Sequence, residues 1–188
     1  NNIYSSNPHN FSGAGDHADF IHLWTELSRQ TSASENIVIR GNMIEQGDGQ
    51  AILGIYLDDN GNGLGFKNVD ISQNVILNGN YQGMRLENVF DSSVTGNTLL
   101  QTSGEAKTAP AILLRNGSQN LDIHGNIVAG VDLSGNGAVA NQIGQNTIVQ
   151  TGNPAAAGYY TADYALQLSK LYSSADGIFS LVYKMASS

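Results

Sequence analysis

The eight residues Leu121-Asp-Ile-His-Gly-Asn126-Ile-Val128 carry the pattern that decides the fold. An aliphatic residue stands three positions before Asn126 and another stands two positions after it, with Gly125 directly before. Apolar and polar residues alternate up to the asparagine, which is typical of a half-buried β-strand. The stretch therefore predicts a short strand, a bend at Gly-Asn, and a second short strand.

The same pattern recurs along the chain at intervals of 32, 23, 29 and 20 residues, centred on Asn42, Asn74, Asn97, Asn126 and Asn146. The flanking aliphatic residues are Ile39, Ile71, Val94, Ile123 and Ile143 before the asparagines, and Ile44, Ile76, Leu99, Val128 and Ile148 after them. One such unit cannot bury its apolar face alone, so the repeat predicts a solenoid of stacked coils. We expect each asparagine to take the bend, in or near the left-handed region, and the stacked amides to form a hydrogen-bonded ladder.

A second predicted strand lies upstream of each asparagine unit, at residues 20–25, 54–59, 83–88 and 111–116, with a poorer fifth copy near 137–140. Alternation predicts which residues of these strands point outward. Aligned across coils, the outward columns are His22, Tyr56, Arg85 and Leu113; Trp24, Asp58, Glu87 and Arg115; and Phe20, Gly54, Gly83 and Ala111. We expect the small residues of the third column to leave room beside the first.

The Ile-x-x-Asn-x-Ile pattern in coils of this length resembles the repeats of right-handed parallel β-helix proteins of the pectate-lyase type. The resemblance covers roughly residues 1–152 and implies an all-β, single-stranded, right-handed parallel β-helix. Because the chain begins in mid-repeat without a capping helix, we expect a further N-terminal portion. Residues 153–188 depart from the pattern, and we expect a helix near 161–172 and a strand near 178–183 to form a small C-terminal cap.

Composition excludes several classes of partner. The 188 residues include 8 Lys and Arg but 16 Asp and Glu, and the formal net charge is −8. No basic cluster is present, so phosphate contacts to a nucleic acid are not expected. No apolar run approaches the roughly 18 residues that cross a membrane. The chain has no Cys and therefore no disulfide framework or thiolate metal site.

The pectate-lyase-type family includes polysaccharide lyases, polyuronate C5-epimerases, glycoside hydrolases and phage tailspikes, and its usual active face is a parallel sheet with flanking loops. The column of His22, Tyr56 and Arg85 spans roughly 10 Å at a coil spacing of about 4.8 Å, which is the scale of a sugar and its neighbours. Removing the C5 proton of a uronate needs a base, for which we assign His22. Neutralising the carboxylate suits the forked guanidinium groups of Arg85 and Arg115, and Tyr56 is the expected proton donor. A solvated polar face is the alternative interpretation.

The stretch from Asp16 to Trp24 is the densest in candidate groups. We expect Asp19 and His17 to orient His22 or to cap the coil edge, and Trp24 to offer a stacking surface to a sugar. Residues 17–22 are loosely similar to the Asn-Thr-Asp-Gly-Ile-His segment of polygalacturonase-like hydrolases, but differ from it at two positions. Substrate contacts are predicted for Trp24, Arg115, Glu87 and His17.

The segment 58–63, Asp-Asp-Asn-Gly-Asn-Gly, matches the first half of a calcium loop. Its predicted ligands are Asp58, Asn60 and Asn62, and Ca²⁺ would help an acidic protein to hold an anionic polymer. The glutamate at the twelfth loop position is missing, and Val69 stands there. An Asx-rich turn explains the same residues, so both interpretations stay open.

The leading functional hypothesis is therefore a carbohydrate-active protein that acts on an acidic polysaccharide by C5-proton abstraction, as an epimerase or a lyase. One alternative is a glycoside hydrolase that uses Asp19 with Asp58 or Asp59. Another is a non-catalytic polysaccharide-binding or structural β-helix. We expect a secreted or cell-surface protein that is a monomer or a trimer.

Overall fold

The computed structural model of the chain describes residues 2–4, 18–26, 28–46, 52–61, 63–101, 108–135, 142–151 and 155. Its strands form three parallel sheets, which we call A, B and C. In spatial order, sheet A holds β1 (Asn2–Tyr4), β4 (Met43–Glu45), β7 (Val75–Leu77), β10 (Thr98–Leu100), β13 (Ile127–Val128) and β16 (Thr147–Ile148). Sheet B holds β14 (Val131–Asp132), β11 (Ala111–Arg115), β8 (Gln82–Glu87), β5 (Leu53–Asp58) and β2 (Asp19–Trp24). Sheet C holds β15 (Gln142–Ile143), β12 (Gln119–His124), β9 (Val89–Thr95), β6 (Phe66–Ser72) and β3 (Ser34–Arg40).

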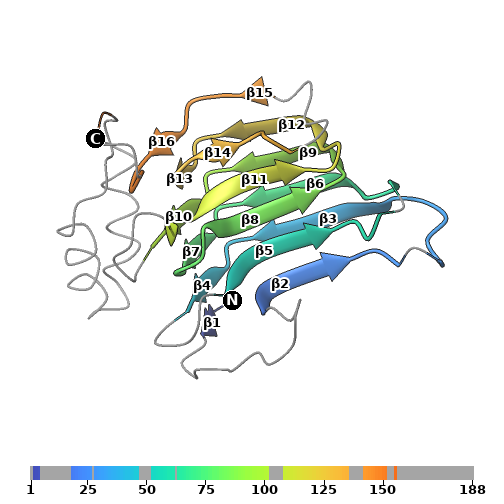
Figure 1. Cartoon of the computed structure of the whole chain (residues 1–188), viewed down its shortest axis with the longest axis horizontal. Helices are drawn as coiled ribbons and strands as arrows, with labels where there is room; N and C mark the ends of the chain where they lie inside the picture. The colour runs from blue at the N-terminus through green and yellow to red at the C-terminus, as the bar shows by residue number, and fades with distance from the viewer. Residues whose placement is uncertain are drawn as a thin grey trace.

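Each sheet is built from every third strand of the chain, so one coil contributes one strand to each of the three sheets (Figure 1). The chain runs from sheet B through sheet C to sheet A and then begins the next coil. All the strand pairs are parallel. This arrangement confirms the predicted parallel β-helix.

The predicted asparagine ladder is present at the bend between sheets C and A. The amide Nδ2 of Asn42 donates to Oδ1 of Asn74 at 2.9 Å, and the series continues through Asn97 and Asn126 to Asn146 at 2.9–3.0 Å. The main-chain N–H of each of the first four asparagines also donates to the Oδ1 of the next one. The Oδ1 of every ladder asparagine from Asn74 onward thus accepts the main-chain N–H at the bend of the preceding coil, which satisfies a backbone donor at that bend.

The prediction that the asparagine itself adopts the left-handed conformation at this bend is wrong. The positive φ angles fall on the residue before each of the first four asparagines: Gly41 (63°), Gln73 (55°), Gly96 (63°) and Gly125 (66°). At three of these turns the residue is glycine, which carries no Cβ and adopts this conformation without steric cost. The asparagine that follows is left to aim its amide along the stack.

The interior of the solenoid is aliphatic, as the alternation predicts. The core includes Ile44, Ile55, Leu57, Ile76, Leu86, Leu99 and Ile112, each with no exposed surface. The last described coil differs, because Ile143 and Ile148 are each 41% exposed. A second apolar cluster, formed by Val75, Leu77, Leu100, Ile127 and Val149, buries the outer side of sheet A. The outer side of sheet A is therefore partly apolar, whereas rows of polar side chains stand on the outer sides of sheets B and C.

Two details of the predicted strand alignment are wrong. Ala111 pairs with Gln82 and Ile112 pairs with Met84, so Gly83 is an extra residue in β8 and forms a bulge. The strand beside β11 is β14, which the predicted alignment did not include; Ile112 pairs with Val131 and Leu113 with Asp132. The predicted fifth copy and, apart from residue 155, the predicted cap at 153–188 lie outside the described residues.

Candidate functional site

The outward row on sheet B forms in the register that the sequence predicts. His22 pairs with Tyr56, Tyr56 with Arg85, and Arg85 with Leu113. In the neighbouring row Trp24 pairs with Asp58, and Glu87 pairs with Arg115. The pairs bring side chains from four coils onto one face, because parallel strands of successive coils stack in register.

His22 lies between two carboxylates. Its Nδ1 is 3.2 Å from Oδ2 of Asp19, and its Nε2 is 3.6 Å from Oδ2 of Asp58. The Asp19 side chain is 4% exposed, whereas that of His22 is 31% exposed. A buried carboxylate at Nδ1 fixes the orientation of the ring, and its Nε2 points towards Asp58 of the neighbouring strand β5.

Tyr56 lies at the centre of the row. Its ring stacks on that of His22, with the centroids 4.8 Å apart and the planes 6° from parallel. On the other side, Cζ of Arg85 lies 5.2 Å from the Tyr56 ring centroid. An imidazole, a phenol and a guanidinium therefore pack as one stack, in which the aromatic face also attracts the cation.

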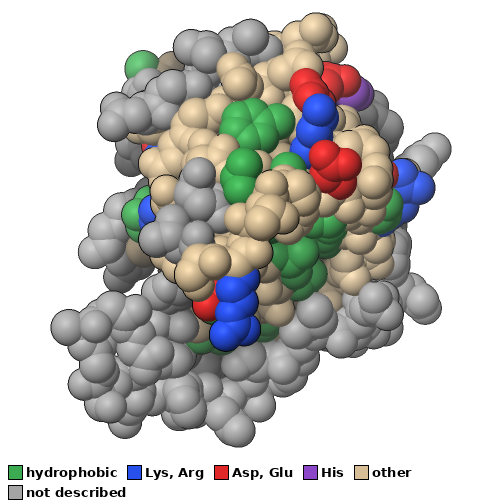
Figure 2. Space-filling view, turned by 90° about the vertical axis from the view of Figure 1, so that its right-hand side faces the viewer, with side chains coloured by type: hydrophobic (Ala, Val, Ile, Leu, Met, Phe, Trp, Pro, Cys, Tyr) green, Lys and Arg blue, Asp and Glu red, His purple; other side chains and the backbone are tan. Residues whose placement is uncertain are grey.

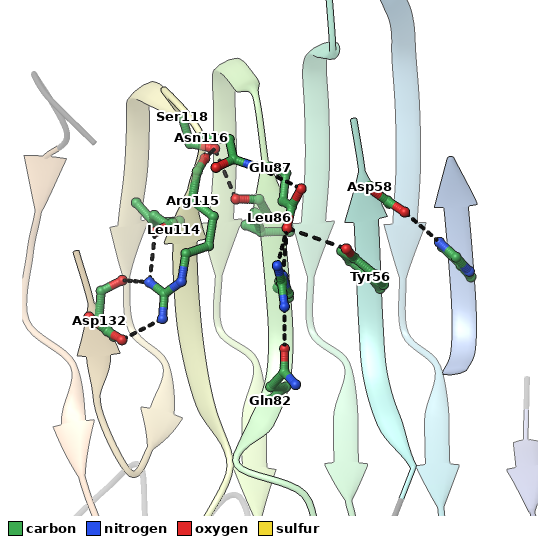
Figure 3. Close-up of polar contacts among 12 residues, drawn as sticks. Tyr56, Asp58, Gln82, Leu86, Glu87, Leu114, Arg115, Asn116, Ser118 and Asp132 are labelled. Atoms are coloured by element: carbon green, nitrogen blue, oxygen red, sulfur yellow. Dashed lines mark hydrogen bonds and ion pairs between the residues drawn. The ribbon is translucent and has the colours of Figure 1, made fainter. Parts of the chain in front are cut away.

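Glu87 holds the polar ends of this stack together (Figure 3). Its Oε1 accepts hydrogen bonds from Nε of Arg85 at 2.6 Å and from the hydroxyl of Tyr56 at 3.3 Å. Its Oε2 accepts one from Nδ2 of Asn116 at 2.8 Å. Burial raises the pKa of Tyr56 well above its usual value, and the nearby Glu87 carboxylate adds to that increase. The phenol therefore stays protonated and donates a hydrogen bond to the Glu87 carboxylate.

A second ion pair closes the row at its far end. Nη2 of Arg115 contacts Oδ2 of Asp132 at 2.6 Å, and Nη1 of Arg115 donates to the carbonyl oxygen of Leu114 at 2.9 Å. Partial burial opposes ionisation of Asp132, but hydrogen bonds from Arg115 and Ser134 outweigh it and lower the pKa of Asp132 to about 2. Both arginines of the predicted site thus carry a carboxylate partner. On the face shown in Figure 2, basic side chains likewise lie beside acidic ones.

The glycines of the outward face do not open space for a ligand, contrary to expectation. A Cβ on Gly54 would lie 2.1 Å from the carbonyl oxygen of Gly83. A Cβ on Gly83 would lie 2.6 Å from Cδ2 of Leu99 and 2.7 Å from Cβ of Pro110. The two glycines let neighbouring segments of backbone approach closely, so the space beside the row is filled by the protein itself.

The predicted calcium loop is organised by a buried carboxylate. Asp59 is 2% exposed, and it accepts hydrogen bonds from the hydroxyl of Thr25 at 2.9 Å and from Nδ2 of Asn88 at 2.6 Å. The main-chain N–H groups of Gly63 and Gly65 donate to the same carboxylate. Within the described ranges, no group of three or more His, Asp or Glu side chains is placed to hold a metal ion. The Asx-rich turn accounts for the order of this loop by itself, and calcium binding stays a prediction.

Two of the predicted site residues, His17 and Asn62, lie outside the described residues. Trp24 is 60% exposed and lies in register beside Asp58, at the β2 end of the face. Sequence reasoning missed Asn116 and Asp132, which complete the pairs of Glu87 and Arg115. Asn116 follows Arg115 directly and has a positive φ of 49°, so an Asn-Gly pair after a strand was the available signal.

Comparison of the chain with protein-family models, with curated proteins and with solved structures found no match. No helix among the described residues is both long and apolar enough to cross a membrane. The functional argument therefore rests on the geometry of the outward faces.

Proposed function

We propose that the outward face of sheet B binds an acidic polysaccharide and removes the C5 proton of a uronate unit. The observation that carries this proposal is the orientation of His22. A nearly buried Asp19 lies 3.2 Å from its Nδ1, and the half-exposed ring stands in one register row with Tyr56 and Arg85. The reaction requires a base and a carboxylate-binding cation, and His22 and Arg85 supply the two groups on either side of Tyr56.

In the proposed step, Nε2 of His22 accepts the C5 proton, and the electron pair of the broken C–H bond passes into the adjacent carboxylate. Return of a proton to the opposite face of C5 gives epimerisation. Expulsion of the 4-O substituent, which leaves with a proton, gives an unsaturated sugar and a shortened chain. Both outcomes begin with the same proton transfer, so the pectate-lyase-type resemblance supports either one.

Arg85 is the group that we assign to the uronate carboxylate. A guanidinium has five N–H donors, and Arg85 directs three of them to described residues: two to Glu87 and one to Gln82. Two N–H groups remain on a side chain that is 34% exposed. Arg115 is the second carboxylate contact, one coil further along, and Trp24 offers its exposed ring at the opposite end.

The geometry gives Tyr56 a positioning part in this mechanism. The residue is 7% exposed, its two ring faces are occupied by His22 and Arg85, and its hydroxyl donates to Glu87. Substitution by Phe keeps the stack and removes the hydrogen bond to Glu87. If Tyr56 only positions its neighbours, Tyr56→Phe lowers turnover by about 10-fold or less, whereas loss of a proton donor lowers it by about 10²–10⁴-fold.

Two observations weigh against the hydrolase alternative. The ring of His22 lies between Asp19 and Asp58, where an inverting hydrolase needs a water molecule between its carboxylates. Asp59 is buried and accepts hydrogen bonds from four residues, so it is not presented to a substrate. The non-catalytic alternative has support of its own, because both arginines of the face are already paired with carboxylates.

Proton NMR of alginate and of pectate, incubated with the protein in D₂O, tests the proposal directly. Deuterium at C5 is the expected result, and unsaturated chain ends separate a lyase from an epimerase. The incubation is repeated with Ca²⁺ and with a chelator, because Asp58 and Asn60 are predicted calcium ligands. Exchange that proceeds equally well in the chelator removes calcium from the mechanism.

His22→Gln and Asp19→Asn are the variants that assign the chemistry. His22→Gln is expected to abolish exchange. Asp19→Asn is expected to lower kcat and to shift its pH profile while KM changes little, because Asp19 acts through His22. Glu35→Gln, an exposed substitution on β3 of sheet C, outside this row, is the control. Exchange that survives His22→Gln overturns the assignment of the base, and an unchanged polymer overturns the proposed function.

A further inference from the structure

A polar groove lies on the outward face of sheet C, on a different face of the solenoid from His22. Its volume is about 540 Å³, within the usual range of small-molecule sites. Four successive coils line it with outward side chains, among them Arg40 of β3, Ser72 of β6, Thr95 of β9 and His124 of β12. These four residues stand in one register row, so the groove crosses the coils and spans roughly 14 Å at a coil spacing of about 4.8 Å.

The charges at the two ends of the groove are neutralised by the protein. Arg40 forms an ion pair with Asp70 and donates from Nε to the hydroxyl of Ser72 at 2.9 Å. At the opposite end, Nδ1 of His124 lies 2.8 Å from Oδ1 of Asp122. The groove therefore has no excess of positive charge with which to hold a phosphate, sulfate or carboxylate group.

The middle of the groove consists of hydroxyl groups. Ser93 and Thr95 are half-buried outward residues of β9, and their hydroxyls have no hydrogen-bond partner among the described residues. A hydroxyl both donates and accepts, which suits a ligand whose own groups do the same. Apart from glycine, the described residues that line the groove are all polar or charged, so an apolar ligand gains nothing from them.

From these observations we propose that the sheet C groove binds an uncharged saccharide, held across the coils by the hydroxyls of Ser93 and Thr95. Arg40 and His124 mark the ends of the bound segment and offer it further donors. This site is independent of the proposed uronate chemistry on sheet B, and its test does not depend on turnover.

The single tryptophan of the chain makes the two faces distinguishable in solution. Trp24 lies on β2 of sheet B, 60% exposed, so its emission reports ligands on that face. We would titrate the whole protein by isothermal calorimetry with uncharged tri- to hexasaccharides of glucose, mannose and xylose, and with trigalacturonate. The expected result is heat of binding from at least one uncharged saccharide, with no change in Trp24 emission.

Thr95→Val and Ser93→Ala are the test variants. Thr95→Val keeps the β-branched shape that suits a strand and removes one hydroxyl, so its circular dichroism and melting temperature are expected to match the parent protein. Loss of one hydrogen bond is expected to weaken binding about 5- to 10-fold. Ser34→Ala, which removes a hydroxyl from the same sheet outside the groove, is expected to leave binding unchanged.

Several results overturn the proposal. If no uncharged saccharide gives heat of binding, the proposed site does not exist. If trigalacturonate binds more tightly than the uncharged saccharides and Thr95→Val weakens that binding, the ligand of the groove is acidic. If binding changes Trp24 emission and its affinity is the same in Thr95→Val and Ser93→Ala, the ligand binds to sheet B. Absence of C5 exchange alone bears only on the function proposed for sheet B.

Discussion

Truncation of one ladder asparagine is expected to destabilise the solenoid far more than an exposed substitution does. Asn97 has no exposed surface and makes four side-chain hydrogen bonds. Its Oδ1 accepts from the main-chain N–H and from Nδ2 of Asn74 at 3.0 and 2.9 Å. Its Nδ2 donates to Oδ1 of Asn126 and to the carbonyl oxygen of Ile71 at 3.0 and 2.9 Å. Asn97→Ala removes all four bonds at once.

The magnitude follows from what the substitution leaves behind. Asn74 keeps a bond from Nδ2 to the carbonyl oxygen of Ile39, and Oδ1 of Asn126 keeps the main-chain N–H of residue 97. The main-chain N–H of Asn74 loses its acceptor inside the protein. A buried group left unsatisfied costs about 1–3 kcal/mol, and the remaining lost bonds add about 1 kcal/mol each. We therefore expect a loss of about 4–6 kcal/mol in the free energy of unfolding, against a typical total of about 5–15 kcal/mol.

Urea unfolding followed by circular dichroism measures this loss, and the matched control is an exposed asparagine of the preceding coil. Asn68 also bonds to an asparagine of the neighbouring coil, through Nδ2 to Oδ1 of Asn36 at 2.6 Å, but this pair is exposed. Because Asn68 has a positive φ of 53°, Asn68→Gly removes the side chain without straining the backbone. We expect this control to cost about 0.5 kcal/mol or less.

Asn97→Asp separates hydrogen bonding from packing, because it keeps the volume and loses both donors. It also places a carboxylate oxygen against Oδ1 of Asn126, so we expect at least the loss seen with Ala. If both Asn97 variants unfold within about 1 kcal/mol of Asn68→Gly, the ladder is not what stabilises the bends, and the reasoning above is wrong.

Three further predictions test the packing and charges of sheet B. Glu87→Leu leaves Arg85 without its carboxylate and is expected to cost about 2–4 kcal/mol in urea unfolding, whereas the isosteric Glu87→Gln is expected to cost less; equal losses would show that the charge of Glu87 is unimportant. Gly54→Ala places a Cβ against the Gly83 carbonyl and is expected to cost about 1–3 kcal/mol or more, while Gly130→Ala, where no atom lies within 4 Å of the new Cβ, is expected to be nearly neutral. Because the pKa of Asp132 is lowered to about 2, its contribution is present above about pH 4 and is lost as the pH falls towards 2. The Asp132 side chain is 41% exposed, so solvent screening limits this contribution to about 1 kcal/mol. Between pH 5 and pH 2.5 the unfolding free energy of Asp132→Asn is therefore expected to decrease by up to about 1 kcal/mol less than that of the parent protein.

The fold was predictable because its determinants repeat. Period-two alternation and the recurring asparagine fixed the strands, and the same alternation aligned His22 with Tyr56 and Tyr56 with Arg85. The bulge at Gly83 was not predictable, since it depends on close packing against Leu99 and Pro110. A repeat pattern predicts which face of the sheet a residue occupies. It does not reveal an inserted residue when the alternation continues on both sides of the insertion.

The residues of the candidate site were easier to predict than the hydrogen-bond and ion-pair partners of those residues. Glu87 and Arg115 were placed in one row, but the partner of Arg115 proved to be Asp132, from the next coil. Coils of this chain differ in length by up to twelve residues, so sequence spacing does not tell which loop residue returns to the face. The structural role of Asp59, which the sequence offered only as a hydrolase carboxylate, was not foreseen for the same reason, because its donors Thr25 and Asn88 come from the coils on either side.

The ion pair between Arg85 and Glu87 limits where an acidic ligand can bind on sheet B. Displacing the buried Glu87 from Arg85 leaves an uncompensated charge, which costs about 3–5 kcal/mol. One new hydrogen bond to a charged group returns only about 1.5–3 kcal/mol. A uronate therefore gains by adding to the two remaining N–H groups of Arg85 and loses by replacing its carboxylate partner. That requirement places the sugar towards β2, where His22 and the exposed ring of Trp24 stand beside each other. Quenching of Trp24 emission by trigalacturonate is thus expected together with C5 exchange, and exchange without any change in that emission would place the chemistry elsewhere.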